Sequence, residues 1–198
     1  MKVELRDTTM RKLIYYVACS LDGFIAREDG SLADFDMGGE HFDDLLREFP
    51  ETIPGHLREQ LGVDGENKQF DAVLMGRKTY EVGLEIGVTS PYPHLDQYLV
   101  SRSIKESPDE SVQIVGDNPL DFVRELKSHS GRDIWLCGGG SLALTLLPEI
   151  DELILKVNPF VMGDGISFIA GSVTKKNLQI QDKQIYDNGF MLLHYSID

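Results

Sequence analysis

The feature of this 198-residue chain that most restricts its fold is a series of short apolar runs separated by helical patterns. Residues 13–20 form a nearly continuous apolar run, which is typical of a strand buried on both faces of a largely parallel sheet. Parallel strands need crossover connections, so this alternation predicts an α/β fold with helices on both faces of the sheet. Further strands are expected at 24–26, 70–75, 97–101, 112–115, 133–137, 152–157, 178–186 and 190–197.

Helices are expected between these strands. Apolar residues repeat at i, i+3, i+4 and i+7 from Phe42, which predicts a helix within 38–61 that two prolines interrupt. Others are expected from about Lys78, from Pro119 to about Ser128 and over 142–147. The turn sequence at 187–189 predicts an antiparallel hairpin at the C-terminus. We expect an N-terminal extension over 1–10 and, over 11–198, one domain with a mostly parallel central sheet flanked by helices.

Composition narrows the function. The net charge of −14 repels phosphate backbones, so nucleic acid is not expected as a partner. Cys19 and Cys137 lie inside apolar runs and are expected as buried free thiols, with no disulfide framework and no metal-ligand spacing. No apolar stretch approaches the roughly 20 residues that span a bilayer, and the N-terminus lacks a signal-peptide core. A cytoplasmic protein without a membrane partner is therefore expected.

Three strand-to-loop junctions carry the chemistry, and in open α/β sheets ligands gather at such strand ends. Gly138, Gly139, Gly140 and Ser141 stand before a helix, where free N–H groups and the positive dipole end favour an anion such as a pyrophosphate. The same glycines would also suit a tight turn without a ligand.

The other two junctions add positive charge. Gly76, Arg77, Lys78 and Thr79 place two cations and a hydroxyl at a helix start, and Ser101-Arg102 adds a further cation. Together these side chains are able to hold a 2′-phosphate, which favours NADPH over NADH. Taken singly, each is equally typical of a solvated surface turn.

Asp22 follows the first strand, and is our candidate for a catalytic carboxylate that orients the substrate or relays a proton. An Asp-Gly turn with no catalytic role is the alternative.

Four segments, residues 20–26, 73–81, 134–141 and 159–168, resemble in this order the dihydrofolate-reductase-like superfamily. The closer resemblance is to the branch that contains the reductase domain of the bifunctional riboflavin-biosynthesis deaminase-reductase. It implies a homodimeric, NADPH-dependent oxidoreductase of a small heterocyclic substrate, of the 5-amino-6-(5-phosphoribosylamino)uracil reductase type.

The resemblance also implies a cis peptide between Gly138 and Gly139 and NADPH lying across the strand ends. The residues that would contact the adenosine side are Gly76, Arg77, Lys78, Thr79, Ser101 and Arg102. Those that would contact the pyrophosphate are Gly138, Gly139, Gly140 and Ser141. Those that would line the nicotinamide pocket are Val17, Ala18 and Ile25.

The chain departs from the family pattern on the substrate side. Cys137 stands where the riboflavin-pathway reductases usually have a glutamate that helps to bind the sugar phosphate. Glu40 and Asp43 lie in the first helical region, but its sequence does not match the pterin-binding motif of dihydrofolate reductases. A deaminase domain is not expected, and residues 50–69 are expected to cover part of the site. Two alternatives stay open: a nucleotide-binding sensor or interaction protein on the same fold, and a dihydrofolate reductase.

Overall fold

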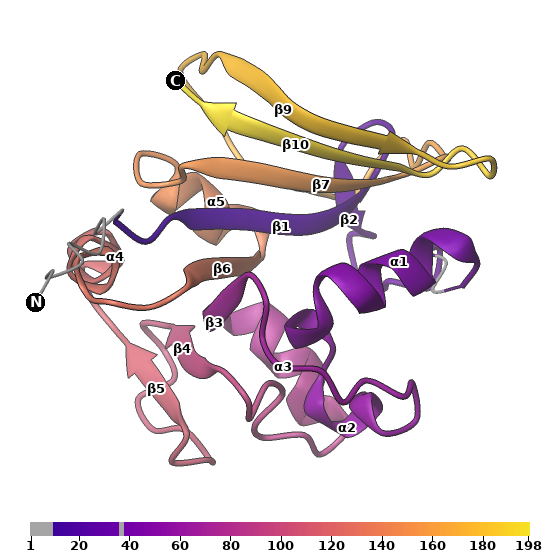
Figure 1. The fold of residues 1–198 in the computed structure, drawn as a ribbon. Helices are drawn as coiled ribbons and strands as arrows, with labels where there is room; N and C mark the ends of the chain where they lie inside the picture. The colour runs from indigo at the N-terminus through magenta and orange to yellow at the C-terminus, as the bar shows by residue number, and fades with distance from the viewer. Residues whose placement is uncertain (1–9, 36–37) are drawn as a thin grey trace, which may run out of the picture.

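The strands form one eight-stranded sheet in the order β5-β4-β3-β6-β1-β7-β10-β9, seen from bottom to top in Figure 1. The computed structural model describes residues 10–35 and 38–198, so nearly all of the expected extension over 1–10 lies outside the described residues. The sheet strands are β1 (Leu13–Ser20), β3 (Phe70–Gly76), β4 (Asp96–Val100), β5 (Val112–Val115), β6 (Asp133–Gly138), β7 (Glu152–Asn158), β9 (Leu178–Ile185) and β10 (Met191–Ile197).

Pairing within the sheet is parallel from β5 to β7 and antiparallel for β10 against both β7 and β9. The predicted fold class, a mostly parallel sheet with a C-terminal antiparallel hairpin, is therefore confirmed. A second, two-stranded sheet joins β2 (Phe24–Ala26) to β8 (Ile166–Ser167). The helices are α1 (Glu40–Glu48), a 3-10 turn (Pro50–Thr52), α2 (Gly55–Arg58), α3 (Arg77–Glu85), α4 (Pro119–Ser128) and α5 (Gly140–Leu146).

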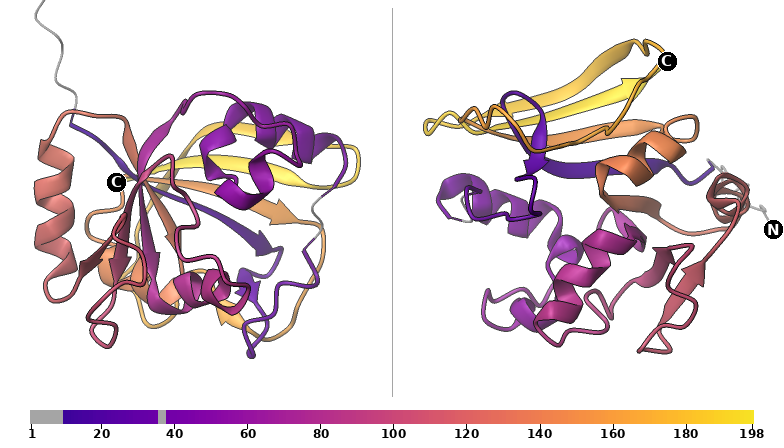
Figure 2. Two further views of the ribbon diagram at one scale, coloured as in Figure 1. Left: turned by 90° about the horizontal axis from the view of Figure 1, so that it is seen from below. Right: turned by 180° about the vertical axis from the view of Figure 1, so that it is seen from behind.

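Each face of the sheet has its own apolar core, and Figure 2 shows the twisted sheet between the two helical layers. Alternate residues of β1 supply both, because neighbouring side chains of a strand point to opposite faces. Ile14 and Tyr16 belong to the core under α1 and α3, which we call the α1 face. Leu13, Tyr15 and Val17 belong to the core under α4 and α5, which we call the α5 face.

The helical region expected over 38–61 is divided into three short pieces. α1 ends at Glu48, and Pro50 opens the 3-10 turn, since a proline cannot continue the hydrogen bonds of the preceding helix. α3 and α5 begin earlier than predicted, at Arg77 and Gly140, because both start directly at a strand end. The sequence did not predict β8, whose two residues are too few to show a period. None of the helices in the described ranges is long and apolar enough to cross a bilayer.

Glu51 fastens the inserted segment to the sheet. Its side chain is fully buried, and its two carboxylate oxygens accept hydrogen bonds from the backbone N–H groups of Lys68, Gln69 and Phe70 at 3.2, 2.6 and 2.7 Å. Phe70 is the first residue of β3. The carboxylate thus anchors residues 50–69 beside the sheet and completes the hydrogen bonding at the start of a central strand.

Replacing Glu51 by alanine should lower the free energy of unfolding by about 3 kcal/mol, because it leaves buried backbone N–H groups without an acceptor. Urea unfolding followed by circular dichroism measures this loss. Glu59→Ala is the matched control, since Glu59 is exposed at the end of α2 in the same segment and should change the value by less than about 0.5 kcal/mol. Equal effects of the two substitutions would contradict the anchoring role of Glu51.

Candidate functional site

The two central strands β1 and β6 separate before they end. They pair only from Leu13–Ile134 to Tyr15–Leu136, whereas β1 stays paired with β7 as far as Ser20. The indole N–H of Trp135 donates to the Tyr16 carbonyl at 3.0 Å, which satisfies the first backbone group beyond the last pair. A gap therefore opens between the C-terminal halves of the two strands, where ligands gather in open α/β sheets.

Ala18 presents backbone groups to this gap. In a parallel strand the N–H and C=O of one residue point to the same neighbour, and those of the next residue point to the other. The carbonyls of Lys12 and Tyr16 accept from the β6 side and that of Leu13 from the β7 side, so Ala18 faces β6. No residue of the described part of β6 pairs with Ala18, which leaves a donor and an acceptor available to a flat amide.

The glycine turn at the end of β6 forms one wall of the gap. Gly138 has φ 131°, a conformation that favours glycine, and the peptide bond from Gly138 to Gly139 is cis, as the resemblance implied. α5 follows with Gly139 as its N-cap, and α3 starts in the same way with Gly76 as its N-cap. No side chain caps either helix, so both N-termini keep N–H donors for an anion.

The two glycine-capped helix starts lie side by side. A methyl group built on Gly76 would be 3.2 Å from the Gly138 carbonyl oxygen. One built on Gly139 would lie 3.8 Å from both Ile25 Cδ1 and Thr79 Oγ1. The structure thus gathers five of the predicted cofactor residues, Gly76, Thr79, Ile25, Gly138 and Gly139, around one space.

A loop buttresses this turn from the α5 face. The Tyr15 hydroxyl donates to the Phe168 carbonyl at 2.8 Å, and the Phe168 N–H donates to the Gly23 carbonyl at 3.0 Å. Gly140 is buried against the same loop and accepts from the Ala170 N–H at 3.1 Å. Its missing side chain is required, because a methyl group there would overlap the Ser167 carbonyl oxygen.

The predicted cations divide into paired and unpaired groups. Arg77 is exposed and ion-paired with Glu81 at 2.8 Å, so its charge is turned along α3. Lys78 and Arg102 are also exposed, and among the described residues neither has an ion pair. Ser101 is buried, and its hydroxyl accepts from the Ile104 N–H at 3.0 Å, which fixes the turn that carries Arg102.

Two further predicted residues fall at the margins of this site. Ser141 is exposed on the first turn of α5. Val17 is buried on the α5 face and contributes to that core.

Asp22 is tied to the loop that follows β7. Its carboxylate accepts from the Ser20 hydroxyl at 2.6 Å and from the N–H groups of Met162 and Gly163 at 3.0 and 2.8 Å. The Ser20 hydroxyl and these backbone donors lower the pKa of Asp22 to about 2. A group that stays ionised at neutral pH is a poor proton donor, so this geometry argues against the proton-relay role and leaves substrate orientation by Asp22 as a prediction.

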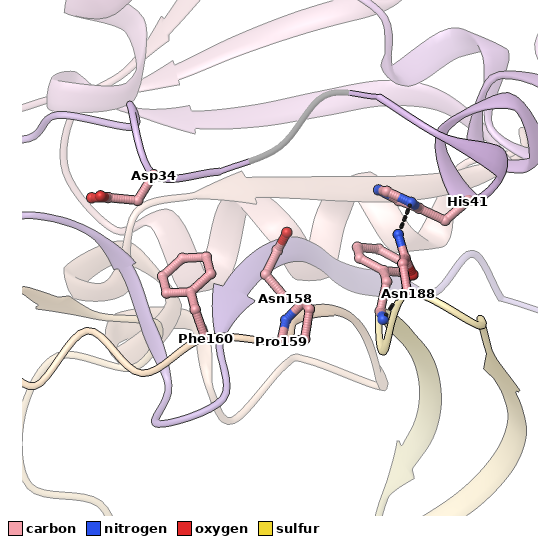
Figure 3. Close-up of a pocket in the computed structure, with 7 residues that line it drawn as sticks. Asp34, His41, Asn158, Pro159, Phe160 and Asn188 are labelled. Carbon is pink, nitrogen blue, oxygen red and sulfur yellow. Dashed lines mark hydrogen bonds between the residues drawn. The ribbon is translucent and has the colours of Figure 1, made fainter.

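A pocket of about 190 Å³ opens where β7 ends (Figure 3). Asp34 and Phe160 lie on one side of it, and His41 and Asn188 lie on the other. A hydrogen bond of 3.0 Å joins His41 Nδ1 and Asn188 Nδ2. His41 is buried on α1 and stacks on Phe190 with ring centroids 4.1 Å apart. No periodic pattern in the sequence indicates this pocket, because its residues come from four separate segments.

Cys137 lies on the α1 face at the edge of the gap. Burial raises the pKa of its thiol to about 11, so the side chain is neutral and does not replace an acidic residue electrostatically. Lys156 of β7 is the charged group nearby, and its ammonium lies 4.1 Å from the centre of the Tyr16 ring. The signal in the sequence is a charged residue inside the otherwise apolar run 153–157, and it was not among the predicted site residues.

Comparison with known proteins identifies the relatives of this fold. The family profile described as the RibD C-terminal domain matches residues 11–192. The uncharacterized protein YwjB of Bacillus subtilis (strain 168) is 30% identical over 187 residues, which cover 93% of this chain and 97% of YwjB.

Two solved structures share the fold. One is a diaminohydroxyphosphoribosylaminopyrimidine deaminase/5-amino-6-(5-phosphoribosylamino)uracil reductase from Thermotoga maritima (TM-score 0.65, 13% identity, 96% of this chain and 57% of that one). The other is the dihydrofolate reductase from Enterococcus faecalis in complex with NADP(H) (TM-score 0.59, 15% identity, 94% and 96%).

Gly140→Ala should destabilise the protein by about 3 kcal/mol, because the added methyl group forces apart α5 and the loop that contains Ser167. Gly116→Ala is the control, since a methyl group there meets no atom within 4 Å and φ is not positive. Thermal unfolding of both variants measures the difference. An unchanged melting temperature for Gly140→Ala would show that the loop does not clasp the glycine turn.

Proposed function

Because this chain belongs to the RibD C-terminal domain family, we propose that it is an NADPH-dependent reductase of a small heterocyclic substrate. A ribosylamino-pyrimidine of the riboflavin pathway, or a related compound, is the substrate class that the family supports. The observation that carries the proposal is the meeting of two helix N-termini beside the β1–β6 gap, each with a glycine as its N-cap residue and no side-chain cap.

The residues present fit a dinucleotide. Gly139 has no side chain, and a methyl group there would lie between Ile25 and Thr79 without overlapping either residue. A ligand can therefore approach the backbone of the turn closely at this point. The uncapped N–H groups of α3 and α5 suit a pyrophosphate, and the backbone of Ala18 suits a carboxamide. Lys78 and Arg102 supply cations for a 2′-phosphate.

The protein's contribution is binding and orientation. When bound, NADPH supplies the hydride. The gap between β1 and β6 would hold the nicotinamide, and Ile25 with the α5-face core would exclude water from one side. The α1 face of the same gap, with Cys137, Tyr16 and the neighbouring pocket, is left for the substrate.

Gly139→Ala should fold normally and bind NADPH at least about tenfold more weakly, because the methyl group occupies the space between Ile25 and Thr79 without a clash. Titration followed by nicotinamide fluorescence measures the dissociation constant. Unaltered affinity in this variant would place the cofactor elsewhere, and absence of NADPH binding by the natural protein at high micromolar concentration would refute the reductase proposal itself.

Arg102→Ala should reduce the preference for NADPH over NADH by about 10-fold or more, because a charge-assisted bond to phosphate contributes roughly 1.5–3 kcal/mol. The two dissociation constants are compared within the same protein, so a general loss of stability cancels. Arg132→Ala is the matched control, since this exposed arginine precedes β6 at the opposite end of the sheet. An unchanged preference would remove Arg102 from the cofactor site.

A nucleotide-binding sensor is the second candidate, and the neutral Cys137 thiol favours it. Such a protein would bind NADPH without oxidising it in the presence of pterins or pyrimidines. Turnover of either class of compound would exclude this candidate.

A further inference from the structure

Lys156 is a charged residue in the interior of a central strand. It lies opposite Ala18 on β1 and Leu192 on β10 in the register of the sheet. Its neighbours two residues away on β7, Ile154 and Asn158, share its face, because side chains of a strand alternate. Ile154 belongs to the core under α1, and Asn158 lines the pocket of Figure 3. Lys156 therefore stands between the α1-face core and the pocket.

The ammonium group of Lys156 lacks the partners that a buried cation normally has. Lys127, the other lysine with a largely buried side chain, bonds the Asp151 carboxylate at 2.7 Å and the Glu149 carbonyl at 3.1 Å. Within residues 10–35 and 38–198, the Lys156 ammonium forms no hydrogen bond or ion pair, and it lies over the Tyr16 ring at 4.1 Å from its centre. A cation–π contact offsets only part of the cost of burying a charge. Because the protein does not pair the Lys156 ammonium, this cation is available to a ligand.

The groups that face Lys156 are neutral near pH 8. Burial raises the pKa of Cys137 to about 11 and raises that of Tyr16 further. Cys19, on the opposite face of β1, also has its pKa raised to about 11 by burial. Burial also lowers the pKa of Lys156 to about 8. The lysine is therefore mostly protonated at neutral pH and yet gives up its proton readily, which suits a general acid.

Charged groups on the elements packed against this face are engaged elsewhere. On α1, Asp44 bonds Arg47, Gln184 and Tyr186. On β10, His194 pairs with Glu152 at 2.7 Å, four residues from Lys156 along β7. His41 bonds Asn188, and Glu51 is held by backbone N–H groups. Glu48, at the end of α1, is exposed, and within the described ranges it forms no ion pair with the lysine.

The ammonium lies beside the point where β1 and β6 part. Tyr16 and Cys137 are the residues directly after the last β1–β6 pair, Tyr15–Leu136, and both face the lysine. We propose that Lys156 contacts the substrate in this gap and donates the proton that completes reduction of its C=N bond. This inference rests on the proposed reductase function and assigns the proton donor, for which Asp22 is poorly suited.

Addition of hydride to the carbon of the C=N bond leaves the former π-electron pair on the nitrogen. One N–H bond of the Lys156 ammonium breaks with its electrons remaining on Nζ, and the proton forms the new N–H bond of the product. The neutral amine then takes a proton from water, and the nicotinamide leaves oxidised.

Three variants separate the roles of Lys156, with 5-amino-6-(5-phosphoribosylamino)uracil and 7,8-dihydrofolate as probe substrates. Lys156→Met should lower kcat by about 10²–10⁴-fold, the usual contribution of a general acid. Lys156→Arg keeps the charge but holds its proton too tightly. Its KM should therefore stay within about threefold of the natural value, while its kcat should fall as much as that of Lys156→Met. Lys183→Met, on exposed β9, should change neither constant.

Readouts besides activity keep this test independent of the substrate. NADPH affinity should be unchanged in all three variants. Lys156→Met should melt at the same or a higher temperature, because a lowered lysine pKa means that the folded state disfavours the proton and is more stable once the charge is removed. In natural protein labelled with ¹⁵N-lysine, the Lys156 amine should titrate near pH 8, and kcat should fall as pH rises through that value.

The outcomes are distinguishable. Absence of NADPH binding refutes the reductase function. Binding of NADPH without turnover of either probe refutes the proposed substrate class, and the NMR titration then decides on Lys156. A kcat of Lys156→Met within about threefold of the natural protein, or an ordinary lysine pKa near 10.5, overturns the proton-donor assignment.

Discussion

The hydrogen-bonded ladder between β1 and β6 stops after Tyr15 and Leu136, and the geometry of the candidate site follows from that stop. A ladder that continued to Ser20 would close the centre of the sheet. Instead, β1 is held by β7 on one side only, and Trp135 satisfies the first freed carbonyl. The free backbone edge at Ala18 and the glycine turn after β6 then face each other across a gap that is built into the sheet itself.

The gap divides the site into two electrically different halves. At the strand ends, the glycine turn and the starts of α3 and α5 offer N–H groups to an anion, and the loop around Phe168 holds the turn in place. On the α1 face, an ammonium that has no ion pair within the described residues stands beside a neutral thiol and the Tyr16 ring. In a chain with a net charge of −14, donor groups and a cation thus lie close together on the two sides of this gap.

Most of the strands and the glycine-rich strand ends were predictable from sequence because their signals are local. The apolar run 13–20 is a buried strand whatever its neighbours are, and a glycine cluster before a helix predicts an anion site from backbone geometry alone. The role expected for Asp22 illustrates the limit of such reasoning. Its position after a strand was informative, but its three hydrogen-bond partners include two residues 140 and 141 positions away in the sequence.

The sequence by itself determined the alternation of strands and helices, the terminal hairpin, and the strand ends that carry glycines and cations, since periodicity, turn chemistry and helix capping act over a few residues. Tertiary structure alone decided where β1 separates from β6 and that Glu51 anchors the inserted segment. It also decided that Arg77 forms an ion pair with Glu81, whereas Arg102 forms none within the described residues. It also decided that Lys156 has no anionic partner among residues 10–35 and 38–198. The charge state and availability of a side chain depend on what packs against it from distant parts of the chain, and no local pattern records that.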